Sequence, residues 1–339
     1  MKRHQSKKDD PFLDARDERL GFVAIGRNEG DRLKRCLTAL SAVSDKVVYV
    51  DSGSIDDSVA FAKSLGVTVV ELDLDHPFTA ARARNAGYAT LLTDDDELEY
   101  VMFIDGDCEL APDFINAATN ELENDSSIGV LTGRCREARR DATIYNLLCD
   151  FEWDGPIGDI PACGGIFVTR VSVFDAVGGF NPAVIAAEDD EFCIRVRKKD
   201  WRIHRIAQDM CFHDANITRF SQWWTRSKRA GHAYGQLGVM HKGYFQAERL
   251  RAWSWGLVLP LLSIGLAPFT KGLSLILLGL YLLSFMRMQR NLSGNGYSPG
   301  DASLYARFLI LSKFPNVIGL IDFWRKKLTG REIKIVEYK

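Results

Sequence analysis

The most constraining feature of the chain is an alternation, between residues 20 and 105, of short apolar runs with helical patterns. The apolar runs are residues 20–26, 46–51, 67–72 and 100–105, and the helical patterns between them centre on residues 33–40, 59–65 and 80–92. Strands of five or six residues that alternate with helices indicate βαβ units and a parallel sheet covered on both faces. We therefore expect an α/β fold with a mainly parallel sheet.

Polar clusters follow three of these predicted strands. They are residues 27–29 after the first strand, 51–54 after the second and 105–107 after the last. In open α/β sheets, ligands bind outside the carboxyl ends of the strands. We therefore expect the three clusters to meet at one edge of the sheet and to form a ligand site there.

The last cluster, Asp105-Gly106-Asp107, places two carboxylates at the tip of an apolar run. A turn would account for these residue types, because Asp and Gly are both favoured in turns. A divalent cation would also account for them, because hard cations prefer carboxylate oxygens and offset the repulsion between two acids. The motif alone leaves both interpretations open.

Asp51 ends the second predicted strand in the sequence VDSGSIDDS. A carboxylate at this position can accept hydrogen bonds from a base or a ribose, and Gly53 lets the backbone approach a ligand closely. The alternative is a capping network that opens the next helix, with Ser54 or Asp56 as the cap. The sequence has no G-x-G-x-x-G after the first strand and no P-loop, which argues against a dinucleotide site and against phosphoryl transfer from a trinucleotide.

Arg82, Arg84 and Asn85 lie near a predicted helix start, just before the acidic strand. Arginines next to a metal site can bind diphosphate oxygens in a bidentate fashion. The alternative is that they are solvated charges on the helix surface. The residue types alone do not decide between the two.

Four consecutive acids, residues 188–191, begin another predicted helix. The helix dipole favours acids at this end, so simple stabilisation is one interpretation. Adjacent acids also repel one another, and one of them can serve as a general base with a raised pKa. His213 follows an apolar stretch and is either a metal ligand or a hydrogen-bonded core imidazole.

The largest change in composition lies between Ala252 and Met286, where Lys271 is the only charged residue. Pro268 and Lys271 split this stretch into two parts, each shorter than the roughly 20 residues that span a bilayer. A re-entrant or interfacial hairpin, two short membrane spans and a buried helical hairpin of a soluble domain all fit this pattern.

An aromatic stretch, residues 304–328, follows and ends in the basic cluster Arg325-Lys326-Lys327. Aromatic helices with basic ends are typical of membrane interfaces, and basic clusters are typical of cytoplasmic flanks. This pattern favours a position at the cytoplasmic face of a membrane.

Charge and cysteine content exclude other classes. The formal net charge of -2 gives no basic field for nucleic acid. The 7 cysteines are odd in number and contain no C-x-x-C pair, which is typical of a reducing compartment and argues against a zinc site. Residues 1–19 are polar and charged without an apolar core, so we expect a polar tail and no cleavable signal peptide.

Six segments, in order, resemble motifs of the family 2 glycosyltransferases, which have the GT-A fold. They are IGRNEGDRLKRCL, VDSGSIDDS, IDGDCEL, ACGGIFVTR with VGGFNP, AAEDDEFCIRVRKKDW and FHDANITRFSQWWTRSKRAG. The resemblance covers residues 21–234. Two features depart from it: Gly26-Arg27 replaces the more usual Pro-x-Tyr lead-in, and no Q-x-x-R-W motif of the processive synthases is present.

The resemblance implies an inverting transfer of a sugar from a nucleotide-diphosphate donor, a hexosyltransferase activity that depends on Mg²⁺ or Mn²⁺. It implies Asp189 as the catalytic base and Asp107 with His213 as metal ligands. The residues implied to bind the nucleotide sugar are Asn28, Glu29, Asp51, Arg84, Asn85, Asp105, Gly106, Arg226 and Arg229.

Together, these observations predict a mobile polar tail over residues 1–19, a GT-A domain over 20–240 and a helical, membrane-associated region over 241–339. The apolar region points to a polyprenyl-linked or other glycan acceptor, to contact with membrane lipid, and to polysaccharide or glycolipid biosynthesis. A nucleotidyltransferase is a rival, but IGRNEGD is a poor match for its Gly-rich basic loop. A non-catalytic module is a second rival, against which the presence of Asp107 and Asp189 argues.

Overall fold

The structure is a computed structural model that describes residues 16–330 except 74, 77, 95 and 96. The chain divides into two compact units, residues 1–216 and 217–339. Residues 1–15 of the predicted polar tail lie outside the described residues. The division comes before the boundary that we predicted at residue 240, so helix α8 falls in the second unit.

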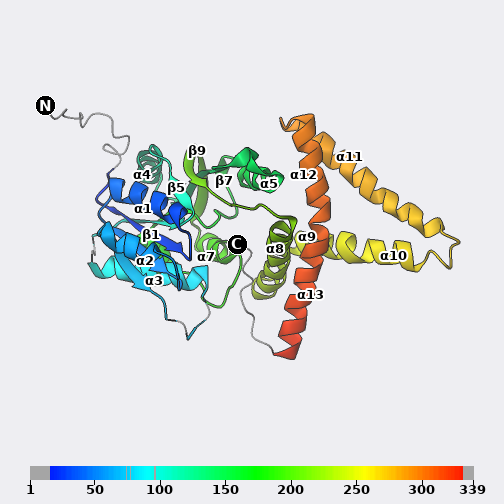
Figure 1. The fold of residues 1–339 in the computed structure, drawn as a ribbon, viewed down its shortest axis with the longest axis horizontal. Coiled ribbons are helices and arrows are strands. Elements are labelled where there is room, and N and C mark those ends of the chain that lie inside the picture. Colours follow the sequence, from blue (N-terminus) through cyan, green and yellow to red (C-terminus); the bar gives the residue numbers. More distant parts are fainter. Residues whose placement is uncertain (1–15, 74, 77, 95–96, 331–339) are drawn as a thin grey trace. The chain divides into compact units, whose positions relative to one another are not determined.

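A nine-stranded sheet forms the centre of the first unit (Figure 1). Its strands are β1 Leu20–Gly26, β2 Val47–Asp51, β3 Thr68–Glu71, β4 Tyr100–Asp105, β5 Cys108–Leu110, β6 Ile128–Glu137, β7 Gly158–Asp159, β8 Phe167–Arg170 and β9 Arg202–His213. The order is β3-β2-β1-β4-β8-β6-β9-β5, and β7 pairs with β9. Strands β1 to β4, β6 and β9 run in one direction and β5, β7 and β8 in the other. The expected α/β class with a mainly parallel sheet is confirmed.

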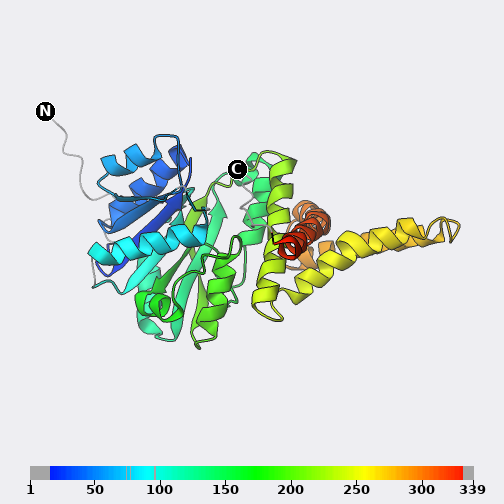
Figure 2. The ribbon, with the colours of Figure 1, turned by 90° about the horizontal axis from the view of Figure 1, so that it is seen from below.

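Helices cover both faces of this sheet (Figure 2). They are α1 Asp31–Val43, α2 Ser58–Ser64, α3 Ala80–Asp94, α4 Phe114–Asn124, the 3₁₀ turn η1 Arg140–Ala142, α5 Ile144–Trp153, α6 Val171–Val177 and α7 Glu188–Arg197. In β1, Phe22 and Ala24 pack with α1 and α4, whereas Val23 and Ile25 pack with α3, α6 and α7. Alternate residues of one strand therefore enter two separate cores, which explains why the strand is apolar throughout.

The strand directions gather the polar clusters at one edge. Because β2, β4, β6 and β9 run the same way, their last residues, Asp51, Asp105, Glu137 and His213, lie along one edge of the sheet. Strands β5 and β8 run the other way, so they begin at that edge. This is the edge at which parallel α/β sheets bind ligands.

The second unit is helical. Its elements are α8 Phe220–Met240, α9 Gln246–Trp253, the π-helical segment η2 Ser254–Val258, α10 Leu259–Gly265, the 3₁₀ segment η3 Leu273–Leu278, α11 Gly279–Gly294, α12 Pro299–Leu311 and α13 Lys313–Thr329. Helices α8 and α13 touch backbone to backbone: a Cβ at Gly231 would lie 2.0 Å from the carbonyl oxygen of Asn316, and one at Gly319 equally close to that of Lys228. Only glycine allows so close an approach.

Helices α10 and α11 form a hairpin that extends away from the α8–α13 pair within this unit (Figures 1 and 2). The chain reverses over residues 266–272, where Lys271 and Gly272 have positive φ, at the break that we predicted. Phe269, Leu273 and Ile276 are 84%, 66% and 71% exposed. The alternative interpretation, that these residues form a hairpin buried inside the domain, is therefore wrong.

Two helical stretches among the described residues have the length and apolar composition to cross a membrane. They are residues Leu273–Gly294 and Pro299–Thr329. The second of these includes α12, the short break at Ser312 and α13, where we had expected one interfacial helix. By themselves, length and composition do not separate spanning helices from helices that lie on a membrane.

Candidate active site

The turn after β4 separates two carboxylates with a glycine. Gly106 donates its backbone N–H to the carbonyl oxygen of Ile25 at 2.7 Å. A Cβ at residue 106 would lie 3.1 Å from that oxygen and 3.0 Å from a methyl group of Leu33. A side chain at residue 106 would therefore be tightly packed, and the turn directs Asp105 and Asp107 to different partners.

Arg84 is a buried cation next to this turn, with 2% of its side chain exposed. It donates hydrogen bonds to Asp105 Oδ1 at 2.8 Å and to Glu188 Oε1 at 2.6 Å. Burial alone would lower the pKa of Arg84, but these two carboxylates raise it above its ordinary value. Two carboxylates of the protein itself thus bind the guanidinium group that we predicted to contact the sugar donor. Contact between Arg84 and the donor stays a prediction.

The Gly164-Gly165 pair of the ACGGIFVTR segment, just before β8, leaves room for this arginine. A Cβ at Gly165 would lie 2.7 Å from Nη2 of Arg84. Gly164 has a φ of 76°, a conformation that favours glycine. One glycine is therefore needed for its backbone conformation and the other for space.

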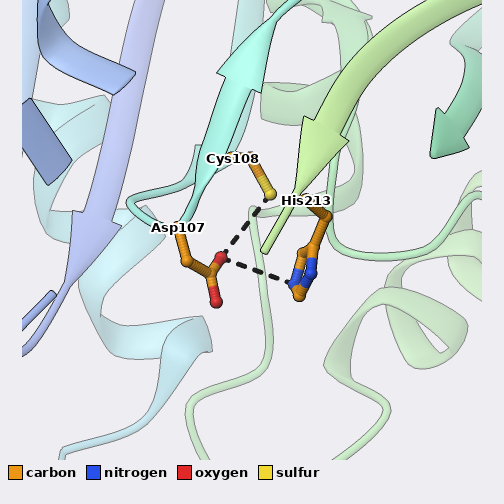
Figure 3. A group of neighbouring side chains, drawn as sticks. All are labelled: Asp107, Cys108 and His213. Atoms are coloured by element: carbon orange, nitrogen blue, oxygen red, sulfur yellow. Dashed lines mark hydrogen bonds and ion pairs between the residues drawn. The ribbon is translucent and has the colours of Figure 1, made fainter. Parts of the chain in front are cut away.

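Asp107 and His213 form the candidate metal site (Figure 3). Asp107 Oδ1 lies 3.4 Å from His213 Nε2 and 3.5 Å from Cys108 Sγ. Ligand atoms of these three residues lie within 4.8 Å of one another. Oxygen and imidazole nitrogen suit Mn²⁺ and Mg²⁺ better than a thiol does, so the Asp107–His213 pair is the fitting part of the set.

The environment of His213 explains its orientation. Its ring centroid lies 4.5 Å from that of Trp153, and Nδ1 lies 4.0 Å from Oε2 of Glu137. Burial raises the pKa of Glu137, while backbone N–H groups of Ala215 and Arg139 act in the opposite direction. At 4.0 Å this is a charge contact and not a hydrogen bond, so Glu137 acts on the imidazole through its negative charge.

Neither Glu137 nor Trp153 is among the site residues predicted from the sequence. The available signal for Glu137 was weak: an acid that follows the mixed run IGVLTGRCR, with no recognisable motif around it. Nothing in the local sequence marks Trp153, because its contact with His213 depends on the placement of α5.

At the other end of the edge, Asp51 is 3% exposed and anchors the loop after β2. Its carboxylate accepts hydrogen bonds from Tyr49 Oη at 2.9 Å and from the backbone N–H groups of Gly53 and Ser54 at 2.9 and 2.8 Å. A hydrogen-bonded loop network is therefore present, but the predicted cap at Ser54 or Asp56 is wrong: α2 begins at Ser58, and its N-cap residue is Asp57. Contact with a base or ribose stays a prediction.

The loops after β1 and β2 are joined through Asn28, which has a φ of 54°. Its backbone N–H donates to Ser54 Oγ at 2.9 Å, and its side-chain oxygen accepts from the backbone of Ile55 at 2.8 Å. Glu29 pairs with Arg32 at 2.6 Å. Asn28 thus joins the two loops at this end of the edge, and its contact with a nucleotide sugar stays a prediction.

Asn85 holds a different segment. Its amide donates to the carbonyl oxygen of Phe180 at 2.7 Å and accepts from the N–H of Phe180 at 2.9 Å. Both functions of the side chain therefore support the loop before α7. Its predicted contact with the nucleotide sugar has no support in these bonds.

The four acids at the start of α7 have distinct environments. Glu188 pairs with Arg84, and Glu191 pairs with Arg195 at 2.7 Å. Asp189 is half-buried, and burial together with Asp190 and Glu188 raises its pKa to about 8, against the lowering effect of Arg84. A carboxyl group of this kind is suited to accept a proton near neutral pH.

Arg226 and Arg229, predicted to contact the diphosphate, lie on α8 in the second unit. That role stays a prediction. Trp223 on the same helix is 3% exposed and packs edge-on against Phe308, with ring centroids 4.8 Å apart. It belongs to the core of the second unit.

Comparisons with known proteins agree with this geometry. Residues 23–175 match the sequence model of the glycosyl transferase family 2. An uncharacterized glycosyltransferase of Rickettsia conorii is 40% identical over 53 residues, which are 16% of this chain and 19% of that protein. A mannosyltransferase from Pyrobaculum calidifontis, solved in complex with GDP-Man and Mn²⁺, superposes with a TM-score of 0.62 and 17% identity over 91% of this chain and 88% of that chain.

The resemblance to the family 2 glycosyltransferases is thus confirmed over residues 23–175. The structural likeness confirms the GT-A fold. The aligned segment spans about a fifth of the Rickettsia relative, so that relative does not fix the activity of the whole chain.

Proposed function

We propose that this protein is an inverting glycosyltransferase that moves a sugar from a nucleotide-diphosphate donor to an acceptor hydroxyl at a membrane. The observation that carries the proposal is the pair formed by the buried Asp107 and the half-buried His213, 3.4 Å apart, at the strand edge that also holds Asp51 and Asp105. This arrangement supports a nucleoside site and a cation site along one edge of the GT-A sheet.

Mg²⁺ or Mn²⁺ fits the carboxylate oxygen and imidazole nitrogen found here, and Asp107 and His213 would hold the ion. A bound cation would supply positive charge next to the diphosphate and so favour its departure. The mannosyltransferase of Pyrobaculum calidifontis, solved with GDP-Man and Mn²⁺, supports this assignment. Asp51 and the loop joined by Asn28 are proposed to receive the nucleoside, with Asp105 next to the ribose or the cation.

Asp189 is the proposed catalytic base. It removes the proton of the acceptor hydroxyl while that oxygen forms a bond to the anomeric carbon. The bond between this carbon and the diphosphate breaks on the opposite face, and the nucleotide diphosphate leaves with the electron pair. The raised pKa of Asp189, about 8, supports a role in proton transfer.

The acceptor is proposed to be lipid-linked or membrane-proximal, for example a polyprenyl-linked glycan of polysaccharide or glycolipid biosynthesis. The exposed apolar hairpin of α10 and α11 supports membrane association, because soluble monomers rarely expose so many large apolar side chains together. The basic cluster at the end of α13 supports the cytoplasmic face. Donor sugar nucleotides and reduced cysteines fit the same compartment.

A thermal-shift panel on the detergent-purified chain tests the donor site. UDP, GDP and dTDP sugars are compared with a CMP sugar, with and without Mn²⁺. We expect one nucleotide class to raise the melting temperature only with Mn²⁺, and Asp107→Asn to abolish this effect. Glu109→Gln is the matched control, because Glu109 lies two residues further on β5 and is half-exposed.

No metal-dependent shift with any nucleotide would contradict the proposal. Stabilisation without turnover in wild-type protein, measured as release of nucleotide from the donor, would favour the non-catalytic module instead. Asp189→Asn separates the two steps: we expect it to keep the donor-induced shift and to lose transfer.

A further inference from the structure

A cavity of about 440 Å³ lies within the second unit, apart from the strand edge described above. Its walls come from α9, η2, α11, α12 and α13. Three of the lining residues are cations: Arg251, Arg287 and Lys313. The volume falls in the range of about 300 to 1,000 Å³ that is typical of ligand sites.

The charges of this cavity are only partly compensated. Arg251 pairs with Glu248 at 2.9 Å. Among the residues that the structure describes, no carboxylate lies within ion-pair distance of Arg287 or Lys313. Three cations that converge on one cavity against a single carboxylate, that of Glu248, indicate an anionic ligand.

The other lining groups suggest which anion. Ser284 and Asn291 lie on the same helix as Arg287 and carry hydrogen-bond donors, while Trp255 supplies an apolar wall. A guanidinium with neighbouring hydroxyl and amide donors matches the several oxygens of a phosphate group. The cavity therefore combines a phosphate-binding side with an apolar side.

The place along α11 of the residues that line the cavity points to a membrane lipid. Exposed apolar side chains, among them Leu282, Leu283 and Met286, occupy α11 up to the residue before Arg287. The cations thus begin where the apolar surface of the hairpin ends. Basic residues at that level meet the headgroup layer when an apolar segment enters a bilayer.

The cavity walls are fixed by contacts within the unit. Tyr281 donates a hydrogen bond from its hydroxyl to the carbonyl oxygen of Trp255. A Cβ at Gly256 would lie 2.2 Å from the carbonyl oxygen of Lys313, so η2 and α13 are in direct backbone contact. Trp255 and Gly256 belong to a π-helical segment, a local structure that is frequent at functional sites.

We infer that this cavity binds the phosphate headgroup of a membrane lipid. The inference rests on the membrane association proposed above but not on the transfer reaction. Arg287 and Lys313 contact the phosphate oxygens, and the acyl chains continue along the exposed apolar surface of the hairpin.

Binding of short-chain lipids to the full chain in detergent, measured by microscale thermophoresis, tests this inference. The probes are dioctanoyl phosphatidic acid, dioctanoyl phosphatidylcholine and glycerol 3-phosphate. We expect the phosphatidic acid to bind at least about tenfold more tightly than either comparator, because it alone combines the phosphate monoester with chains. R287Q should weaken its binding by about tenfold, the effect of losing one charge-assisted contact.

R290Q is the matched control. Arg290 lies on the same helix and is exposed, but it does not line the cavity, so R290Q removes the same charge without touching the site. The side chain of Arg287 is exposed as well, and R287Q is therefore expected to fold. K313Q provides a second variant from another wall of the cavity.

Equal binding of the two lipids would overturn the inference, and so would equal effects of R287Q and R290Q. Binding of glycerol 3-phosphate as tight as that of phosphatidic acid would show a site for a soluble phosphate instead of a lipid. The nucleotide-induced thermal shift, measured on the same samples, reports the donor site separately. An intact shift without lipid selectivity would therefore reject this inference alone.

Discussion

Arg84 and Glu188 form a buried ion pair at 2.6 Å that joins the start of α7 to α3. The same guanidinium also binds Asp105 at 2.8 Å, directly after β4. One cation thus connects the acidic turn with the helix that carries Asp189. Its position couples the geometry of the proposed donor side to that of the proposed base.

Arg84→Gln is expected to destabilise the protein by about 3–5 kcal/mol, because it leaves two carboxylates in a buried site without their cation. The measurement is thermal or chemical unfolding of the detergent-purified variant. Arg82→Gln is the control. Arg82 lies two residues before Arg84 on α3 and pairs with the exposed Asp73, which precedes the helix, so little change in melting temperature is expected. Similar melting temperatures for the two variants would refute a structural role of the Arg84 network.

Asp189→Asn is expected to lower the transfer rate by a factor of roughly 10² to 10⁴, the contribution of a general base. In the wild-type protein, a base with a pKa of about 8 is active in its deprotonated form, so kcat/KM should rise with pH and level off above about 8. Initial rates between pH 5.5 and 9.5 check this profile. A flat profile in wild-type protein, or full activity in Asp189→Asn, would remove Asp189 from the mechanism.

The same carboxyl group predicts a cost in stability. Between its ordinary pKa of 3.8 and about 8, the folded state binds a proton that the unfolded state has released. The contribution of Asp189 to stability is therefore present at low pH and falls as the pH rises through this window. We expect Asp189→Asn to melt at a higher temperature than the wild-type protein, with a difference that grows from pH 5 to pH 8. A difference that shrinks over that range would show that the pKa is not raised.

The sequence predicts the strands in the first half of the first unit better than those in its second half. The predicted strand over residues 100–105 coincides with β4, and those over 20–26 and 46–51 match β1 and β2 within one residue. These strands lie in the middle of the sheet, where burial on both faces leaves a continuous apolar run. Local pattern is then a sufficient signal.

The remaining sheet depends on pairing between distant segments. Strand β8 inserts antiparallel between β4 and β6, and the last residue of β6, Glu137, lies opposite His213 in β9. The sequence around His213 allowed both a metal ligand and a core imidazole, and by itself it favoured the core imidazole. What decides its environment is the strand register that brings it to Asp107 and Glu137. Asn85 shows the same limit, because its partner Phe180 is 95 residues away.

Glu137→Gln is expected to weaken Mn²⁺ binding by about tenfold, because it removes a negative charge that lies 4.0 Å from the His213 imidazole. In wild-type protein, the two oxygens of Glu137 accept hydrogen bonds from the backbone N–H groups of Arg139 and Ala215. In Glu137→Gln, the amide nitrogen replaces one of these oxygens and cannot accept its hydrogen bond. Isothermal titration of the purified variant with Mn²⁺ measures the change, and Glu109→Gln again serves as the control. Unchanged affinity in Glu137→Gln would show that His213 is positioned without it.

We expect the α10–α11 hairpin to be the part of the protein that contacts the membrane. Phe269→Glu together with Leu273→Glu should reduce the fraction of protein that floats with phosphatidylcholine–phosphatidylglycerol vesicles, because both side chains are largely exposed at the end of the hairpin and a charge there opposes entry into lipid. Ile55→Glu is the control, since Ile55 is an equally apolar side chain, 94% exposed, on a loop of the first unit. Flotation assays after removal of detergent compare the three proteins. If the hairpin is the membrane contact, only the hairpin variant leaves the vesicle fraction, and its nucleotide-induced thermal shift stays intact. Equal flotation of the hairpin variant and the Ile55 variant would mean that another surface holds the protein at the membrane.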